Sequence, residues 1–550
     1  MMKKTLTVLV SLIFPSMLFA QVIGSIDNQF NSIRQNGVST IAAYGDTVWI
    51  SPALNRNIGN NADWYIPENA DSVTDGIGRV FSLALGQDTV MAGLGYSASS
   101  PDGSVPAGYG FYISTDGGET WNFSDFPLDE NPPAKCQSSS EDYERPESVE
   151  DYDPDCDIVF QYGGETYTRT RTTVSEQSPP YELSFSDETI FAAVWGSGLI
   201  RSTNFGETWE KVILPPTTES SLVPEDTYFW TSTFSFFNEN TQRSDTATIN
   251  RYDPRIDNNL LGFSVHIDSQ NRVWFGGAAG VNVSHNALTA PTDSISWKHV
   301  SFDNSSDGLT GDWIISIQEE PGTGRIWMTN WIASNENESH SIVYTEDEGE
   351  TFTQMLIGEK VNDIGFKDGY VFAAGVNGLF ISSDGGDTWI KSPQIKSANT
   401  FIKSSAEFQA VAATTDRIWI GSNDGIASTD NYGQSWEITR VDFPLSGGNV
   451  YEPEARNVNS YAYPNPFSAS VYEVVRIKFE VEQQGNVNVR IFDFGMNLVR
   501  EVENNSFSPG TYEAVWDGYD EKGRKVANAP YIYVIETGDD KISGKILVVD

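Results

Sequence analysis

An eight-residue pattern recurs along the chain and constrains its fold more than any other feature. The pattern reads Ser-x-Asp-x-Gly-x-x-Trp at residues 114–121. It returns, with Thr for Ser, Asn for Asp or Phe for Trp in some copies, at residues 202–209, 345–352, 382–389 and 429–436. Such a repeat indicates an array of similar structural units.

Each copy is predicted to form a tight hairpin turn. An Asp or Asn side chain accepts hydrogen bonds from backbone N–H groups a little further along the chain. The Gly adopts a positive φ, and the aromatic residue packs beneath the turn. The turn-forming residues are Asp116, Asn204, Asp347, Asp384 and Asn431. We interpret them as structural and assign no chemistry to them.

A second repeat, an apolar strand, a polar turn and another apolar strand, precedes the turns. Its seven copies begin near residues 41, 81, 183, 263, 314, 364 and 411. With a Gly-rich strand and the turn hairpin added, each unit has four strands, and seven such units are typical of a seven-bladed β-propeller. The first and fourth units lack a clean turn copy, and we expect Trp64 and Trp297 to replace its aromatic residue.

The chain is predicted to be all-β, a seven-bladed β-propeller followed by a small β-sandwich. Lys3 and Lys4, an apolar run and Ala20 indicate a signal peptide. After about residue 447 the repeats stop and short alternating strands suggest a sandwich. The predicted organisation is a signal peptide over 1–20, a propeller over 22–445 with insertions at 124–180 and 215–259, a linker over 446–458 and a sandwich over 459–550.

The eight-residue pattern resembles the Asp-box, or BNR repeat, of bacterial sialidases and related β-propellers. In that family the box closes the outer hairpin of a blade, away from the ligand face. The resemblance therefore implies a propeller, and it implies that the five turns are not the active site.

The tail resembles the immunoglobulin-like domain of flagellar hook-capping proteins and the C-terminal sorting domain of type IX secretion cargo. The matching residues are Tyr463-Pro-Asn-Pro466, Trp516-Asp-Gly518 and the strand around Tyr531. The sorting resemblance implies contact with secretion machinery and export across an outer membrane. Asp550 ends the chain where that family more often has a basic residue. A sorting module and a merely structural or adhesive sandwich both stay open.

Charge and cysteine content indicate an exported protein. The formal net charge is −42, which would repel nucleic acid and anionic lipid. No apolar run after the signal peptide is long enough for a transmembrane segment. Cys136 and Cys156 are the only cysteines, and an isolated pair in an exported protein most often forms a disulfide. We expect a secreted or cell-surface protein that passes through the periplasm of a Gram-negative bacterium.

One acidic stretch has the spacing of a cation-binding loop. Asp151, Asp153, Asp155 and Asp157 alternate as oxygen ligands for calcium would, although Cys156 stands where a Gly would permit the turn. The alternative is a solvated acidic loop. No other cofactor is expected.

Four aromatic residues are candidates for stacking on a ligand: Trp230, Phe234, Trp327 and Trp331. The alternative is packing beneath long loops. The predicted function is binding of an extracellular glycan or protein.

The alternative function is a glycoside hydrolase of the Asp-box propeller type, xyloglucanase-like or sialidase-like. The Arg-Ile-Pro motif that supplies a carboxylate-binding arginine near the first blade of sialidases is absent. Arg34, Arg56 and Arg79 lie in this part of the chain, but none is followed by Ile-Pro. Among 76 acidic residues the sequence selects no catalytic pair. A hydrolase should show paired carboxylates, one with a raised pKa, beside aromatic residues in the axial mouth.

Overall fold

The computed structural model describes residues 28–30, 32–59, 63–66, 78–101, 103–397, 400–441, 458–538 and 540–550. The predicted signal peptide lies outside these residues, as does the predicted linker except for Val458. The described chain forms β-strands and short 3₁₀ helices. Within it, no helix has the length and apolar character needed to cross a membrane.

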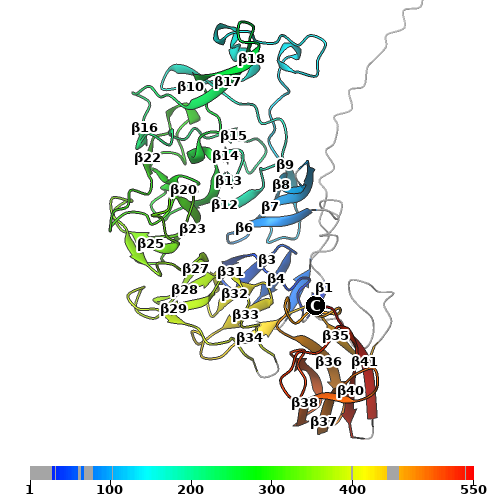
Figure 1. The fold of residues 1–550 in the computed structure, drawn as a ribbon. Helices are drawn as coiled ribbons and strands as arrows, with labels where there is room; N and C mark the ends of the chain where they lie inside the picture. Colours follow the sequence, from blue (N-terminus) through cyan, green and yellow to red (C-terminus); the bar gives the residue numbers. More distant parts are fainter. Residues whose placement is uncertain are drawn as a thin grey trace, which may run out of the picture.

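Among the described residues, seven antiparallel sheets each contain four strands that are neighbours in chain order (Figure 1). The first contains β2 (Thr40–Tyr44), β3 (Thr47–Ser51), β4 (Asn55–Ile58) and β5 (Trp64–Ile66), with β1 (Asn28–Phe30) added beside β5. The second contains β6 (Gly78–Leu85), β7 (Val90–Ser100), β8 (Gly103–Ser114) and β9 (Asn122–Asp125). The third contains β12 (Pro180–Ser186), β13 (Thr189–Val194), β14 (Gly198–Ser202) and β15 (Glu210–Lys211).

The remaining four sheets repeat this order. The fourth contains β19 (Gly262–Ile267), β20 (Val273–Gly277), β21 (Gly280–Ser284) and β22 (Trp297–Val300), with β16 (Ser221–Leu222) added beside β22. The fifth contains β23 (Trp313–Glu319), β24 (Ile326–Trp331), β25 (Ser341–Thr345) and β26 (Thr353–Met355). The sixth contains β27 (Val361–Lys367), β28 (Tyr370–Gly375), β29 (Gly378–Ser382) and β30 (Ile390–Lys391). The seventh contains β31 (Phe408–Ala413), β32 (Ile418–Ser422), β33 (Gly425–Thr429) and β34 (Glu437–Thr439).

The first strands of successive sheets contact one another in a closed series. The contacts run from β2 through β6, β12, β19, β23 and β27 to β31, and β31 contacts β2. At this closure the Val38 N–H donates to Ser422 O (2.9 Å) and the Gly425 N–H donates to Asn36 O (2.7 Å). The prediction of an all-β chain with repeated four-stranded sheets resembling propeller blades is confirmed.

Hydrophobic cores lie between neighbouring sheets, as expected of propeller sheets, which cover their faces by stacking. Trp49 of the first sheet shares a buried cluster with Leu94 and Trp121 of the second. Trp274 of the fourth sheet shares another with Met328 of the fifth. Each sheet therefore buries its two faces against its neighbours.

The five predicted turns all have the same hydrogen bonds. At the first, Ser114 Oγ accepts from the Gly118 N–H (2.8 Å) and donates to Asp116 Oδ1 (2.8 Å). The Thr120 N–H donates to Asp116 Oδ1 (2.8 Å). Equivalent bonds surround the other four turn residues, namely Asn204, Asp347, Asp384 and Asn431.

The fourth sheet contains a related turn that sequence inspection missed. Ser284 Oγ accepts from the Ala287 N–H (3.0 Å), and Asn286 Oδ1 accepts from the Ser296 N–H (2.9 Å). Extra residues separate Asn286 from Ser296, so the eight-residue spacing is lost. Trp297 is buried here, as expected of a residue that replaces the box aromatic.

The two predicted insertions contribute two-stranded hairpins that lie together at one end of the molecule (Figure 1). These cap hairpins are β10 (Ile158–Tyr162) with β11 (Glu165–Arg169), and β17 (Thr231–Asn238) with β18 (Arg243–Asn250). Short 3₁₀ helices accompany them: η2 (Ala134–Cys136), η3 (Val149–Asp151), η4 (Pro154–Cys156), η5 (Asn258–Leu260) and η6 (Thr292–Ser294). Cys136 and Cys156 form the predicted disulfide.

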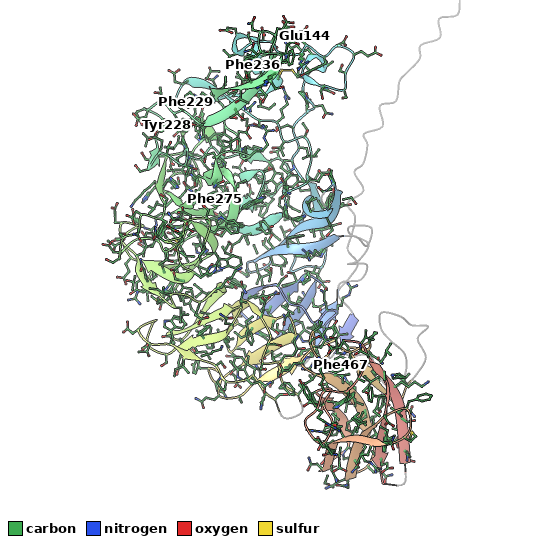
Figure 2. The ribbon with its side chains drawn as sticks, in the orientation of Figure 1. Glu144, Tyr228, Phe229, Phe236, Phe275 and Phe467 are labelled. Atoms are coloured by element: carbon green, nitrogen blue, oxygen red, sulfur yellow. A yellow bond between two sulfur atoms is a disulfide. The ribbon has the colours of Figure 1, made fainter. Side chains whose placement is uncertain are left out.

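The C-terminal residues form two antiparallel sheets at the other end of the molecule (Figure 1). One contains β35 (Ser460–Tyr463), β36 (Val475–Val481) and β39 (Gly510–Trp516). The other contains β37 (Gly485–Phe492), β38 (Leu498–Phe507), β40 (Ala529–Thr537) and β41 (Asp540–Val548). Both contribute to one core, which includes Phe467, Val489 and Trp516, so the sheets pack as a β-sandwich (Figure 2).

Candidate functional site

The first strands of the seven sheets surround a cavity of about 770 Å³. Every sheet contributes to its lining, for example through Thr40, Ser82, Glu182, Phe263, Ser316, Asp363 and Gln409. Sites for small ligands typically have volumes of about 300–1,000 Å³. We call the end of the cavity at which the first strands begin the axial mouth. The Asp-box turns join third to fourth strands and therefore lie at the opposite ends of the sheets.

Side chains on the first strands connect each sheet to the next. Ser82 Oγ of the second sheet donates to Pro180 O of the third (2.8 Å). Ser264 Oγ of the fourth sheet donates to Ile314 O of the fifth (2.9 Å). A strand irregularity between β6 and β7 and another between β19 and β20 adjoin these serines, which turns their hydroxyls toward the neighbouring sheet.

Glu182 takes the equivalent place in the third sheet and lines the cavity. Its Oε2 accepts from the Val265 N–H of the fourth sheet (3.1 Å). Within the described residues, Oε1 has no hydrogen-bond partner. Although part of the side chain reaches the cavity, protein surrounds it, and this burial raises the pKa of Glu182 well above its usual range. The charge of Asp363 raises this pKa further.

Asp363 takes the same place in the sixth sheet, and both of its oxygens are engaged. Oδ1 accepts from Ser316 Oγ (2.9 Å) and from the Ile364 N–H (2.9 Å). Oδ2 accepts from the Val411 N–H of the seventh sheet (2.9 Å). Burial raises the pKa of Asp363 to about 6 despite these bonds. The cavity therefore holds two carboxyl groups with raised pKa values, one of them fully committed to joining sheets.

Five aromatic rings from the second to the fifth sheet form a continuous chain beside the axial mouth. The ring centroids of Phe81 and Tyr181 are 6.2 Å apart, and those of Tyr181 and Phe263 are 5.9 Å apart. Phe263 then lies 4.7 Å from Trp195 and 5.2 Å from Trp313. None of the five side chains is buried. We call these residues the aromatic arc.

Two cations lie over aromatic rings that line the same cavity. The Arg79 guanidinium is 4.6 Å from the Phe81 ring centroid, and Lys360 Nζ is 3.8 Å from that of Trp331. Neither cation forms an ion pair within the described chain. The mouth therefore offers both ring faces and N–H donors.

The four aromatic residues predicted to contact a ligand have different environments. Trp331 lines the axial cavity, and its indole N–H donates to Val361 O (2.6 Å). Trp230 and Trp327 are instead fully buried in hydrophobic cores, so neither offers a ring face to a ligand. Phe234 packs against Tyr152 in the cap, with ring centroids 5.2 Å apart. Only Trp331 of the four is brought to the axial mouth.

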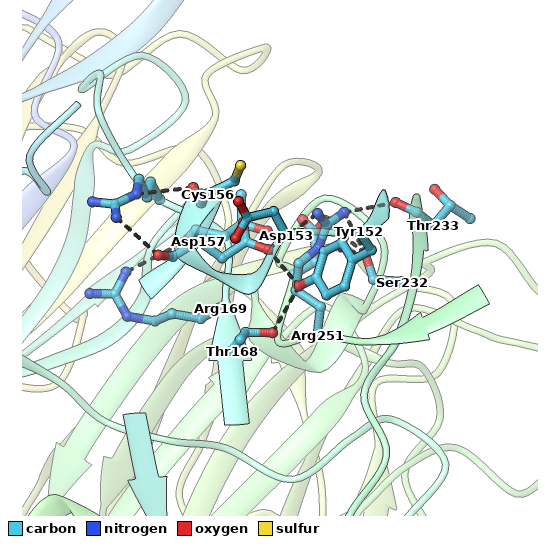
Figure 3. A network of polar contacts seen from close by, with 12 residues as sticks. Tyr152, Asp153, Cys156, Asp157, Thr168, Arg169, Ser232, Thr233 and Arg251 are labelled. Carbon is cyan, nitrogen blue, oxygen red and sulfur yellow. Dashed lines mark hydrogen bonds and ion pairs between the residues drawn. The ribbon is translucent and has the colours of Figure 1, made fainter. Parts of the chain in front are cut away.

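The predicted calcium loop lies in a polar network of the cap (Figure 3). Asp157 accepts from the Tyr152 hydroxyl (2.8 Å) and lies 3.5 Å from an Arg251 nitrogen. Asp153 forms an ion pair with Lys135. These two carboxylates therefore already have cationic or hydroxyl partners.

The other two carboxylates of this loop have separate surroundings. Asp151 accepts from the Glu147 N–H (2.9 Å) and the Ser148 N–H (2.8 Å), which caps η3. The Asp155 side chain is 74% exposed. In the part of the chain that the structure describes, no group of three or more His, Cys, Asp or Glu side chains is arranged to hold a metal. This geometry favours the solvated-loop alternative, and calcium binding stays an untested prediction.

A second cavity, of about 560 Å³, lies beside the cap and contains an unusual lysine. Lys211 Nζ donates to Thr172 Oγ1 (2.6 Å). The nearby Asp129 is held by Arg169 through two hydrogen bonds (2.6 and 2.7 Å). Burial lowers the pKa of Lys211 to about 7, and the charge of Arg169 lowers it further than Asp129 raises it. No sequence signal distinguished this lysine from the others.

Comparisons with known proteins identify the repeat. Residues 112–123 match the family model of the BNR/Asp-box repeat. No curated protein sequence matches the chain.

Several solved structures resemble the chain at low identity. PorZ, described as an essential bacterial surface component of the type IX secretion system of Porphyromonas gingivalis, is 11% identical with a TM-score of 0.32, over 93% of this chain and 81% of that one. YCF48 bound to D1 peptide is 12% identical with a TM-score of 0.38, over 78% and 100%. The GH74 xyloglucanase from Xanthomonas campestris is 12% identical with a TM-score of 0.20, over 94% and 93%. Identities this low concern the fold alone, and TM-scores below 0.5 support no functional conclusion.

Proposed function

We propose that the protein is an exported seven-bladed β-propeller that binds a glycan or protein at or outside the cell surface through its axial mouth. The observation that supports this proposal best is the aromatic arc: none of its side chains is buried, and three of its rings, those of Phe81, Tyr181 and Phe263, line the cavity. The disulfide of the cap is consistent with an oxidising, extracytoplasmic location.

A glycan suits this mouth better than an extended peptide. Sugar rings present flat C–H faces that stack on aromatic rings, and the arc offers several such faces in succession. Arg79 and Lys360 add N–H donors for hydroxyl or carboxylate oxygens. A cavity of about 770 Å³ accepts one or a few sugar units, whereas a peptide would need a longer groove.

The test is a glycan array probed with the wild type and with Tyr181→Ala and Trp313→Ala. Each substitution removes one ring of the arc and should weaken binding about tenfold or more, as expected for a central aromatic contact. Phe229→Ala is the matched control, because Phe229 is 51% exposed but lies near the cap (Figure 2). Equal binding by all four proteins would exclude the axial mouth as the site.

Glycoside hydrolysis is the second candidate, and Glu182 is the observation that favours it. Burial and the charge of Asp363 raise its pKa, which is the direction that a general acid requires, and Asp363 supplies a second carboxyl group in the same cavity. Asp363 is the weaker partner, because its oxygens already accept three hydrogen bonds. A binding role therefore ranks first.

Release of reducing sugar, measured beside the array, separates the two candidates. A hydrolase should release sugar from a bound glycan, and Glu182→Gln should abolish release while binding persists. Xyloglucan and sialylated glycans should both be tried. Of the three arginines considered for a sialidase clamp, Arg79 lines the cavity, whereas Arg56 donates to Gly117 O in an Asp-box turn (2.7 Å). Binding without release would rule out hydrolysis.

For the C-terminal sandwich we propose a sorting role through contact with secretion machinery. Support comes from the resemblance of Tyr463-Pro-Asn-Pro466 and Trp516-Asp-Gly518 to sorting domains. A reporter fused to residues 455–550 should reach the surface or the medium of a host with type IX secretion. A reporter that stays in the periplasm would remove the sorting role and leave a structural sandwich.

A further inference from the structure

Two arginines and two carboxylates meet where the sandwich contacts the seventh sheet. Asp424 lies between β32 and β33, and Arg440 follows β34. Arg476 lies in β36 and Glu513 in β39 of the sandwich. None of the four side chains is more than 13% exposed. We call these four residues the docking quartet.

Charges of opposite sign alternate in the docking quartet. Asp424 Oδ2 accepts from Arg476 Nη2 (3.0 Å) and from Arg440 Nη2 (3.3 Å). Glu513 Oε2 lies 3.7 Å from Arg476 Nε and 3.9 Å from Arg440 Nη1. Each carboxylate thus contacts one arginine of its own domain and one of the other. Removing one member leaves the quartet with one buried charge in excess, which is strongly unfavourable.

The loop that precedes β31 adds further contacts to the sandwich. Arg476 Nη2 donates to Phe401 O (2.9 Å), and its guanidinium lies 5.3 Å from the Phe401 ring centroid. Ser404 Oγ donates to Glu473 Oε2 (2.9 Å). The contact therefore combines charge, hydrogen bonds and ring stacking on a single surface of the seventh sheet.

We propose that the seventh sheet is a docking site for the sandwich, which stays bound there without a covalent connection. Separating the two would expose four charges that are now paired and shielded from water. Under this proposal, a tail that is cut from the propeller within the connecting segment remains as a bound subunit. Attachment of the sandwich to the seventh sheet does not depend on which ligand the axial mouth binds.

The test is a full-length protein with a site-specific protease site inserted between residues 446 and 457. The folded protein is cleaved and passed over a sizing column at micromolar concentration under native conditions. The two fragments should elute together in equal amounts. Separate elution of the wild-type fragments would overturn the proposal.

Two variants show whether the docking quartet holds the fragments together. Arg476→Ala should weaken association about 100-fold, as truncation of one partner in a buried charge pair does. Arg490→Ala is the matched control, because Arg490 pairs with Glu536 in the other sheet of the sandwich. Fragments that stay together in Arg476→Ala, or separate equally in Arg490→Ala, would contradict the role of the quartet.

Loss of association through misfolding of the sandwich must be distinguished from loss of docking. Asp424→Ala alters the seventh sheet and leaves the sequence of the sandwich unchanged. The fragment that it releases should still show the fluorescence of a buried indole, because Trp516 is 1% exposed in the sandwich core. Retention of the sandwich by Asp424→Ala would also count against the proposal.

Discussion

The indole of Trp49 fills the space that a side chain at Gly118 would need. A Cβ at Gly118 would lie 2.6 Å from Cζ2 of Trp49, which belongs to the preceding sheet. The same relationship recurs between Trp327 and Gly386, where the distance to Cη2 is again 2.6 Å. The Gly of these two Asp-boxes thus has two roles: it allows the turn, and it lets one sheet pack closely against the next.

Gly118→Ala should therefore destabilise the protein more than Gly117→Ala. Both residues have positive φ, +94° and +73°, so each substitution introduces backbone strain of about 1 kcal/mol. Only Gly118→Ala adds a clash with Trp49, because nothing lies within 4 Å of a Cβ at Gly117. We expect a total loss of about 3 kcal/mol at Gly118. Denaturant midpoints of the two variants provide the measurement, and equal midpoints would show that the indole moves aside without penalty.

Reduction of the disulfide should loosen the cap before it affects the ring of sheets. Cys136 and Cys156 are 20 residues apart, and a cross-link that closes a loop of this size stabilises by about 3 kcal/mol. Limited proteolysis with and without reductant should show new cleavage between the two cysteines. A Cys136→Ser/Cys156→Ser variant is the control and should be cleaved equally in both conditions. Unchanged cleavage of the reduced wild type would show that the polar network of Asp157 and Arg251 suffices.

Lys211→Met should stabilise the protein most below pH 7. The ordinary lysine pKa is 10.5, and that of Lys211 is lowered to about 7 in the folded state. Between these values the unfolded chain binds a proton that the folded protein lacks, so wild-type stability rises with pH across this window. The advantage of Lys211→Met should shrink from pH 7 towards pH 10 in thermal unfolding. Lys391→Met serves as the control, because Lys391 is exposed. A stability difference between Lys211→Met and the wild type that stays constant with pH would contradict the lowered pKa.

Calcium at millimolar concentration should produce no binding heat with the wild type. The ion would have to displace Lys135 from Asp153 and Arg251 from Asp157, and it would find Asp151 already capping η3. Lys135→Ala removes the cation that is paired with Asp153, and the variant should bind calcium more readily than the wild type. Isothermal titration calorimetry measures this heat. A heat of calcium binding by the wild type that a chelator abolishes would support the calcium site.

Local chemistry made the repeated turns predictable from sequence. Asp116 and its counterparts act through neighbours within four residues, so their spacing alone reveals the turn. The turn at Asn286 was not predicted because its partner Ser296 lies ten residues away, outside the eight-residue pattern. The hydrogen bond still forms because the intervening residues loop out.

The axial mouth was not predictable in the same way. Tyr181, Phe263 and Trp313 come together because each begins, or nearly begins, a first strand in a different sheet. Glu182 and Asp363 share one structural position on two sheets, but among 76 acids nothing local distinguishes them. Trp230 and Trp327 were predicted as candidates for ligand contact, but both are buried. The exposure of an aromatic ring depends on the elements that pack against it, which the local sequence does not reveal.

Closure of the ring joins residues from the two ends of the repeat array. The Val441 N–H donates to Asn36 Oδ1 (2.8 Å) across 405 residues of sequence. A nascent chain cannot make this bond until nearly all of the array has left the ribosome. Contacts between residues so distant along the chain are slow to form. Until the ring closes, β2 lacks its contacts with β31. The face of the first sheet that packs against Trp419 therefore stays uncovered until the seventh sheet has been synthesised and has folded.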